Sequence, residues 1–73
     1  MRLPQVSGRE CVRALLRAGF AVRRQRSSHI TLTRDDPFAQ VTVPAHDQVD
    51  RGTLRAIIRQ VGLSVDEFTQ LLK

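Results

Sequence analysis

The chain has 73 residues, of which 41% are hydrophobic and 26% are charged, a composition that fits one small globular domain and excludes a disordered chain. The net charge of +5 is unevenly distributed, because residues 1–34 hold eight arginines and one acid, whereas residues 35–73 hold four bases and six acids. This asymmetry favours a surface that binds a polyanion over a solvated basic face without a ligand.

The cysteine and hydropathy patterns exclude several classes of protein. The single cysteine, Cys11, cannot form an internal disulfide and is expected to be a core thiol in a reducing compartment. No apolar run is long enough for a signal peptide or a membrane span. One cysteine and two distant histidines do not suffice for a structural zinc site. We therefore expect a cytoplasmic protein with no metal, no cofactor and no membrane partner.

The first predicted helix begins after Ser7, which together with Glu10 forms a capping box. Its apolar residues recur at helical spacing, and its arginines recur every four residues on the outer face. Gly19 is placed to end the helix. The apolar residues are Cys11, Val12, Leu15, Leu16 and Ala18, and the arginines are Arg9, Arg13 and Arg17.

Three strands are predicted next, over residues 20–25, 29–33 and 40–43. We expect Phe20 and Val22 to point inward from the first strand. The second strand alternates strictly, with Ile30 and Leu32 on one face and polar side chains on the other. Residues 26–28 and 34–37 are the predicted turns, and Pro44 ends the third strand. The tight turns make the sheet an antiparallel meander.

Two further helices are predicted in the second half. The first is capped near Asp50, has Leu54, Ile57, Ile58 and Val61 on one face, and ends at Gly62. The second is short and begins with a capping box of Ser64 and Glu67. The order of elements predicts a single two-layer α+β domain over residues 1–73, with helices covering one sheet face. The open face is expected to carry Ala21, Arg23, Gln25, His29, Thr31, Thr33, Gln40 and Thr42.

The open face offers one candidate for catalysis, His29, beside a turn that is rich in arginine. RNA suits such a site, because its 2′-hydroxyl is an internal nucleophile next to a phosphodiester. An imidazole can move the proton near neutral pH, and arginines can hold the phosphate. On chemistry alone, the alternative is an ordinary exposed strand residue. His46 is interpreted as a loop histidine, or as a second catalytic group if the fold brings both histidines together. No glycine-rich phosphate loop or Gly-x-Ser-x-Gly elbow is present.

Several segments, in order along the chain, resemble the HicA toxin family, the small mRNA interferases of type II toxin–antitoxin systems. The resembling segments are residues 3–8, 19–20, 24–29, 41–46, 51–60 and 62–64. The resemblance implies an α-β-β-β-α fold like that of the double-stranded-RNA-binding domain. It also implies metal-independent RNA cleavage with His29 as the essential histidine, and a HicB antitoxin that shields the site. Arg23, Arg24, Arg26 and Ser28 are the candidate RNA-binding residues, because they lie close to His29 in the sequence.

The chain departs from the family at Ser27, where the family usually has glycine. We expect Ser27 either to adopt a different turn or to strain into the left-handed region. Two alternatives to a toxin nuclease follow. One is an RNA-binding module without catalysis, and the other is a toxin-like subunit that the change at Ser27 has inactivated.

Overall fold

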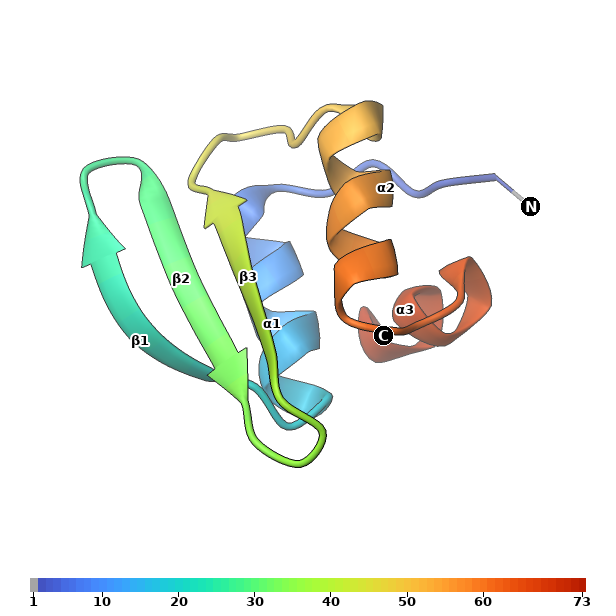
Figure 1. The fold of residues 1–73 in the computed structure, drawn as a ribbon. Coiled ribbons are helices and arrows are strands. Elements are labelled where there is room, and N and C mark those ends of the chain that lie inside the picture. The colour runs from blue at the N-terminus through green and yellow to red at the C-terminus, as the bar shows by residue number, and fades with distance from the viewer. Residues whose placement is uncertain (1) are drawn as a thin grey trace.

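The computed structural model describes residues 2–73, which form three helices and a three-stranded antiparallel sheet (Figure 1). In chain order the elements are α1 (Gly8–Arg17), β1 (Ala21–Arg26), β2 (His29–Arg34), β3 (Ala39–Pro44), α2 (Arg51–Gln60) and α3 (Val65–Leu71). The strands are neighbours in the order β1-β2-β3. The predicted α+β class, the meander and the short last helix are therefore confirmed. No helix within residues 2–73 is long and apolar enough to cross a membrane.

The helices begin at the predicted capping residues. The Ser7 hydroxyl accepts a hydrogen bond from the Glu10 N–H at 3.0 Å, and the Glu10 carboxylate accepts one from the Ser7 N–H at 2.8 Å. These hydrogen bonds hold the pKa of Glu10 below its ordinary value. Ser64 and Glu67 form the same capping box at α3. Such caps satisfy backbone donors that the first turn of a helix leaves unpaired.

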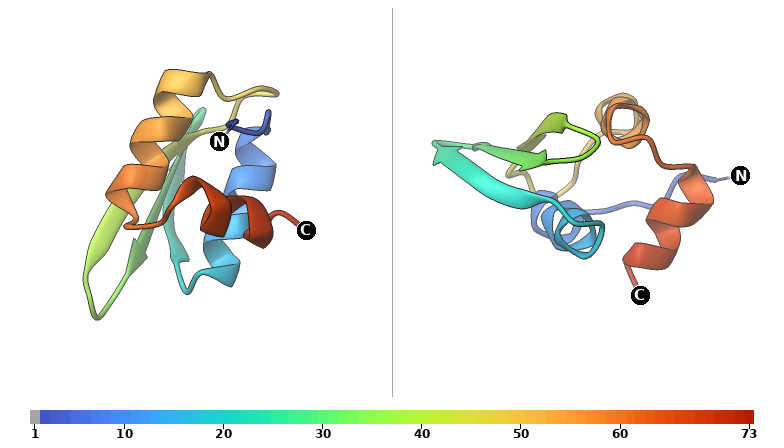
Figure 2. Two further views of the ribbon diagram at one scale, coloured as in Figure 1. Left: turned by 90° about the vertical axis from the view of Figure 1, so that its right-hand side faces the viewer. Right: turned by 60° about the horizontal axis from the view of Figure 1, so that its bottom comes forward.

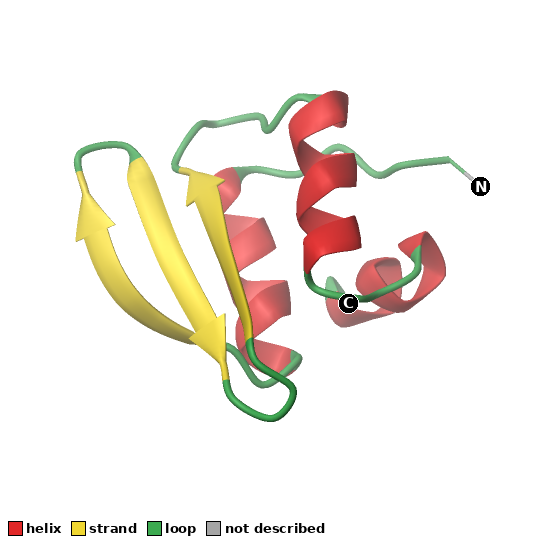
Figure 3. Cartoon of the chain, in the orientation of Figure 1, coloured by secondary structure: helices red, strands yellow, loops and turns green. Residues whose placement is uncertain are grey.

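Helix α1 lies against one face of the sheet, with α2 beside β3 and α3 farther from the strands, as the two views of Figure 2 show. Helix α1 contacts β1 and β3, α2 contacts β3, and α3 packs against α1. In Figure 3 the β1–β2 hairpin projects beyond the helices, which leaves β1 at a free edge. The opposite face of the sheet carries no helix.

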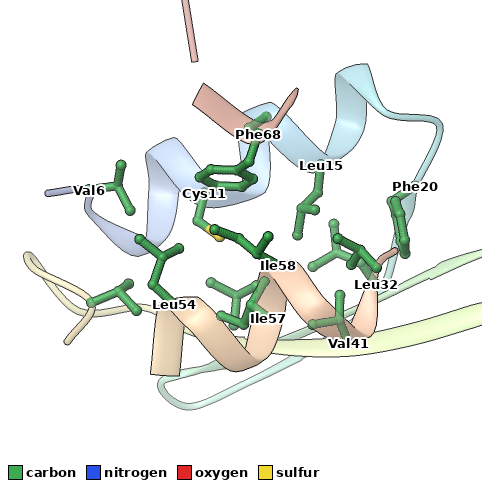
Figure 4. Close-up of a cluster of buried hydrophobic side chains, with 14 of the residues drawn as sticks. Val6, Cys11, Leu15, Phe20, Leu32, Val41, Leu54, Ile57, Ile58 and Phe68 are labelled. Atoms are coloured by element: carbon green, nitrogen blue, oxygen red, sulfur yellow. The ribbon is translucent and has the colours of Figure 1, made fainter. Parts of the chain in front are cut away.

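The core lies between the helices and the covered face of the sheet (Figure 4). Leu15, Leu32, Leu54 and Phe68 are fully buried there. Burying one such side chain contributes about 1.5–3 kcal/mol. Cys11 is buried among them, and desolvation raises the pKa of its thiol to about 12. The prediction of a core thiol is thus confirmed.

Two arginines of the basic half support the fold. Arg17 donates from its guanidinium to the carbonyl oxygens of Leu71 and Lys73, which joins the end of α1 to the C-terminal segment. Arg34 lies 4.8 Å from the centroid of the Phe20 ring, and its Nη1 donates to the Val61 carbonyl at 3.5 Å. These two arginines are therefore engaged within the protein.

Strand β1 departs from the predicted alternation. Its pairing with β2 is irregular between Val22 and Arg24, so Arg23 is the extra residue of a β-bulge. After the bulge, the side chains of β1 point to the opposite faces from those predicted, and Gln25 is paired with Ile30 on the helix side. The prediction that Gln25 lies on the open face was wrong for this reason. Val22 is paired with the buried Leu32, but its own side chain is 45% exposed at this edge of the sheet.

The turn between β1 and β2 consists of Ser27 and Ser28 only, because Arg26 is paired with His29. Arg26 therefore belongs to the strand and not to the turn, where it was predicted. Ser27 has a φ of 56°, so of the two expected alternatives the left-handed region is the one observed. A non-glycine residue in this region costs about 1–2 kcal/mol.

We predict that Ser27→Gly stabilises the protein by about 0.5–1 kcal/mol, because relief of backbone strain exceeds the extra entropy of glycine in the unfolded chain. Urea unfolding measures the change. Ser28→Gly is the matched control, since Ser28 has no positive φ and glycine there should destabilise by about 0.5–1 kcal/mol. Equal effects of the two substitutions would contradict the account of strain at Ser27.

Candidate functional site

His29 is the first residue of β2, and its side chain points to the uncovered face of the sheet. Its neighbour Ile30 is buried on the helix side, and adjacent side chains of a strand point to opposite faces. His29 is exposed and is paired with Arg26 of β1 and Pro44 of β3. The alternation predicted from the sequence therefore gives the observed orientation of His29.

The bulge in β1 places three arginines on the same face as His29. Arg24 is paired with Thr31 and Arg26 with His29, and cross-strand partners share a face. Arg23 donates from Nε to the Thr33 hydroxyl at 2.9 Å, which holds its guanidinium over this face as well. All three arginines are exposed. We define His29, Arg23, Arg24 and Arg26 as the basic open face.

Ser28 lies directly before His29 in the two-residue turn and is half-buried. Its carbonyl oxygen accepts a hydrogen bond from the Ala45 N–H at 2.7 Å. This bond ties the turn to the residue that follows β3. Pro44, the last residue of β3, has no N–H and cannot donate such a bond. The backbone around His29 is thus held from both neighbouring strands.

This arrangement combines a group that can transfer a proton with cations that can bind a phosphate. Guanidinium groups bind phosphate oxygens bidentately and stabilise negative charge that develops during phosphoryl transfer. An imidazole accepts and donates protons near neutral pH. The basic open face therefore has the groups that cleavage of an RNA phosphodiester needs. Within residues 2–73, no three His, Cys, Asp or Glu side chains are placed to hold a metal ion.

The second histidine, His46, lies in the loop between β3 and α2. It lines an open cavity of about 550 Å³ together with Ile30 and Gln25, both of which are on the helix side. His29 does not line this cavity. The cavity therefore contains only one of the two histidines, and it gives no support to a shared acid–base pair.

The cavity also contains residues that sequence reasoning did not select. Arg9 comes from α1, Gln25 from β1, and Ala45 and Asp47 from the loop between β3 and α2. These positions are far apart in the chain, and no motif links them. The one available signal was His46 itself, directly after the third strand.

Comparison with known protein families shows one family to which this chain is similar. A family model for the HicA toxin of bacterial toxin–antitoxin systems matches residues 8–63 of the 73-residue chain. The matched span contains α1, the whole sheet and α2, and it includes every residue of the basic open face. Comparison with curated protein sequences found no match.

Proposed function

Because the chain belongs to the HicA toxin family and is the toxin of a bacterial toxin–antitoxin system, we propose that it is an endoribonuclease that cleaves mRNA with His29 as general acid and base. The observation that supports this best is the exposed His29 on the same sheet face as three arginines. The family match also agrees with the resemblance that the sequence motifs indicated.

The proposed reaction needs one proton carrier. The His29 imidazole removes the proton from a 2′-hydroxyl, whose oxygen attacks the adjacent phosphorus. The bond from phosphorus to the 5′-oxygen breaks, and the imidazolium returns the proton to that oxygen. The products are a 2′,3′-cyclic phosphate and a 5′-hydroxyl. Arg23, Arg24 and Arg26 bind the phosphate and stabilise the charge on its oxygens. Ser28 positions His29 or the phosphate from the turn.

Single-stranded RNA and DNA of the same sequence, incubated with the protein in EDTA, test this function. We expect cleavage of RNA alone, because only RNA carries the 2′-hydroxyl. RNA that is bound but not cleaved would favour the second candidate, an RNA-binding module without catalysis. The basic open face by itself supports that candidate, because phosphate contacts account for binding without chemistry.

The arginines of the basic open face give a quantitative prediction. We expect Arg24→Ala to raise the Kd for single-stranded RNA about 5- to 10-fold, since a charge-assisted hydrogen bond contributes about 1–1.5 kcal/mol at an exposed site. The slope of log Kd against log salt concentration should decrease by about 0.7 for the lost phosphate contact. Fluorescence anisotropy at several salt concentrations measures both quantities.

Arg55→Ala provides the control for the arginine prediction, because Arg55 is an exposed arginine on α2, away from the open face. It should leave the salt slope unchanged within error. An equal loss of slope in both variants would show that RNA binding follows the total charge and not the basic open face.

Membership of a toxin–antitoxin family also implies that this chain has an antitoxin partner. We propose that the antitoxin is of the HicB type and covers the basic open face. A protein that covers three exposed arginines gains affinity and association rate by presenting acidic groups to them. The same Arg24→Ala variant should therefore weaken the complex, which titration calorimetry with the purified antitoxin would measure.

A further inference from the structure

The cavity that contains His46 lies at the end of the sheet where the β1–β2 turn, the end of β3 and the start of α1 meet. In Figure 1 these three parts lie together at the top of the molecule. The cavity measures about 550 Å³, which is within the range of about 300–1,000 Å³ for sites that hold small ligands. It is open to solvent on one side of the sheet, whereas the basic open face is on the other.

The walls of the cavity are fixed by backbone contacts between distant segments. The Gly8 N–H donates to the His46 carbonyl at 2.9 Å, and the Val49 N–H donates to the Val6 carbonyl at 2.8 Å. The Ala45 N–H donates to the Ser28 carbonyl at 2.7 Å. Because these bonds join α1, the turn and the loop after β3, the cavity is formed before any ligand binds.

The lining residues suit a planar heterocycle with polar edges. Ile30 and Ala45 provide apolar contact, and Ile30 retains 8% exposure, the largest value among the buried core residues. Around them are the Gln25 amide, the His46 imidazole and the Asp47 carboxylate. An amide and a carboxylate pair with the donors and acceptors on the edge of a base, and an imidazole can stack on its face.

Residues that line the cavity are direct sequence neighbours of residues in the basic open face, although the cavity opens on the opposite side of the sheet. Ile30 in the cavity directly follows His29, and Gln25 directly precedes Arg26. Consecutive Cα atoms are about 3.8 Å apart. An RNA strand that passes around the narrow Ser27–Ser28 turn can therefore present a phosphate to His29 and an adjacent base to the cavity. Arg9 also lines the cavity and brings a positive charge to it, which suits the phosphate of a nucleotide.

We propose that this cavity binds one unpaired base of the substrate RNA, next to the cleaved bond, and thereby determines sequence preference. The proposal rests on the proposed RNA-cleaving function. Gln25, His46 and Asp47 select the base by hydrogen bonding and stacking. Double-stranded RNA does not fill the cavity, because a paired base cannot leave its stack without loss of pairing energy.

Removal of single bases from the RNA tests the proposal. The probes are a decamer RNA that contains all four bases and ten derivatives, each with one abasic nucleotide. For the wild-type protein we expect one abasic position beside the cleaved bond to lower kcat/KM about 10-fold, because the base that stacks in the cavity is missing. The Gln25→Ala variant should have a similarly reduced kcat/KM on the intact decamer and should lose most of the response to that abasic position.

Gln60→Ala is the matched control, because Gln60 is an exposed glutamine at the end of α2 and does not line the cavity. It should respond to the abasic series as the wild-type protein does. If the abasic penalty is equally large in the Gln25→Ala variant, or if no position shows a penalty, the cavity does not hold a base and the proposal is overturned.

Binding measurements separate this proposal from the proposed function. The Kd of each decamer is measured by anisotropy with His29→Ala and with His29→Ala combined with Gln25→Ala. A penalty at one abasic position that only the first variant shows supports the cavity, even if the wild-type protein cleaves no RNA. Cleavage that depends on His29 without such a penalty supports the nuclease and overturns the cavity.

Discussion

The His29→Ala variant is expected to lose RNA cleavage by about 10²–10⁴-fold in kcat, which is the usual contribution of a positioned proton-transfer group. The fold and the affinity for RNA should change little. His29 is exposed, and surface substitutions of this kind usually alter stability by less than about 0.5 kcal/mol. The three arginines proposed to bind phosphate also remain in place. Single-turnover cleavage of a labelled RNA measures the rate of cleavage. Circular dichroism reports on the fold, and fluorescence anisotropy measures the affinity for RNA.

His46→Ala is the comparison for this variant, since His46 is the other histidine of the chain and lines the cavity, which His29 does not. It should retain kcat within a few-fold and change mainly KM, through the proposed base cavity. A loss in kcat as large as that of His29→Ala would show that both histidines take part in the chemistry. A His29→Ala variant that cleaves at the wild-type rate would remove His29 from the mechanism.

The second large effect is expected at Gly8, the first residue of α1. A Cβ atom at this position would lie 2.1 Å from the Pro44 carbonyl oxygen and 3.0 Å from the Ala45 Cα. Both are backbone atoms, so the end of β3 must move away from α1, and the Gly8–His46 hydrogen bond is weakened with it. We therefore expect Gly8→Ala to destabilise the protein by about 2–3 kcal/mol, which is typical of overpacking.

Gly52→Ala distinguishes this steric effect from helix propensity. Gly52 is in the first turn of α2, and a Cβ there would meet only the Asp50 carboxylate, at 3.4 Å. Alanine should be neutral or stabilise by up to about 1 kcal/mol. A change of 1 kcal/mol in the free energy of unfolding shifts Tm by about 4–8 °C in a domain of this size. Thermal unfolding therefore distinguishes the Gly8→Ala variant from the Gly52→Ala variant. Similar Tm values for both variants would contradict the close approach at Gly8.

Local signals account for the parts of the fold that the sequence predicted well. Capping boxes at Ser7 and Ser64 involve residues three positions apart, and Gly19, with a φ of 96°, is a local stop for α1. The alternation around His29 is equally local, because Ile30 and Leu32 must both point to the core. For this reason the orientation of the candidate catalytic residue could be inferred before the structure.

The bulge at Arg23 could not be predicted, because it depends on how β1 pairs with β2 and not on the residues of β1 alone. Strict alternation would have directed Arg24 to the helix side and Gln25 to the open face. The bulge reverses both, so it completes the arginine cluster and places Gln25 in the cavity. The cavity itself joins α1, β1 and the loop after β3, and only tertiary structure brings these segments together.

In the proposed mechanism, the RNA 2′-hydroxyl attacks the adjacent phosphodiester while His29 moves the proton. Mass spectrometry of the 5′ fragment from a decamer RNA cleaved in EDTA tests it most directly. We expect a 2′,3′-cyclic phosphate on that fragment, a 5′-hydroxyl on the other, and no cleavage when the nucleotide before the broken bond is 2′-deoxy. A 3′-hydroxyl paired with a 5′-phosphate would show that water is the nucleophile and would contradict the mechanism.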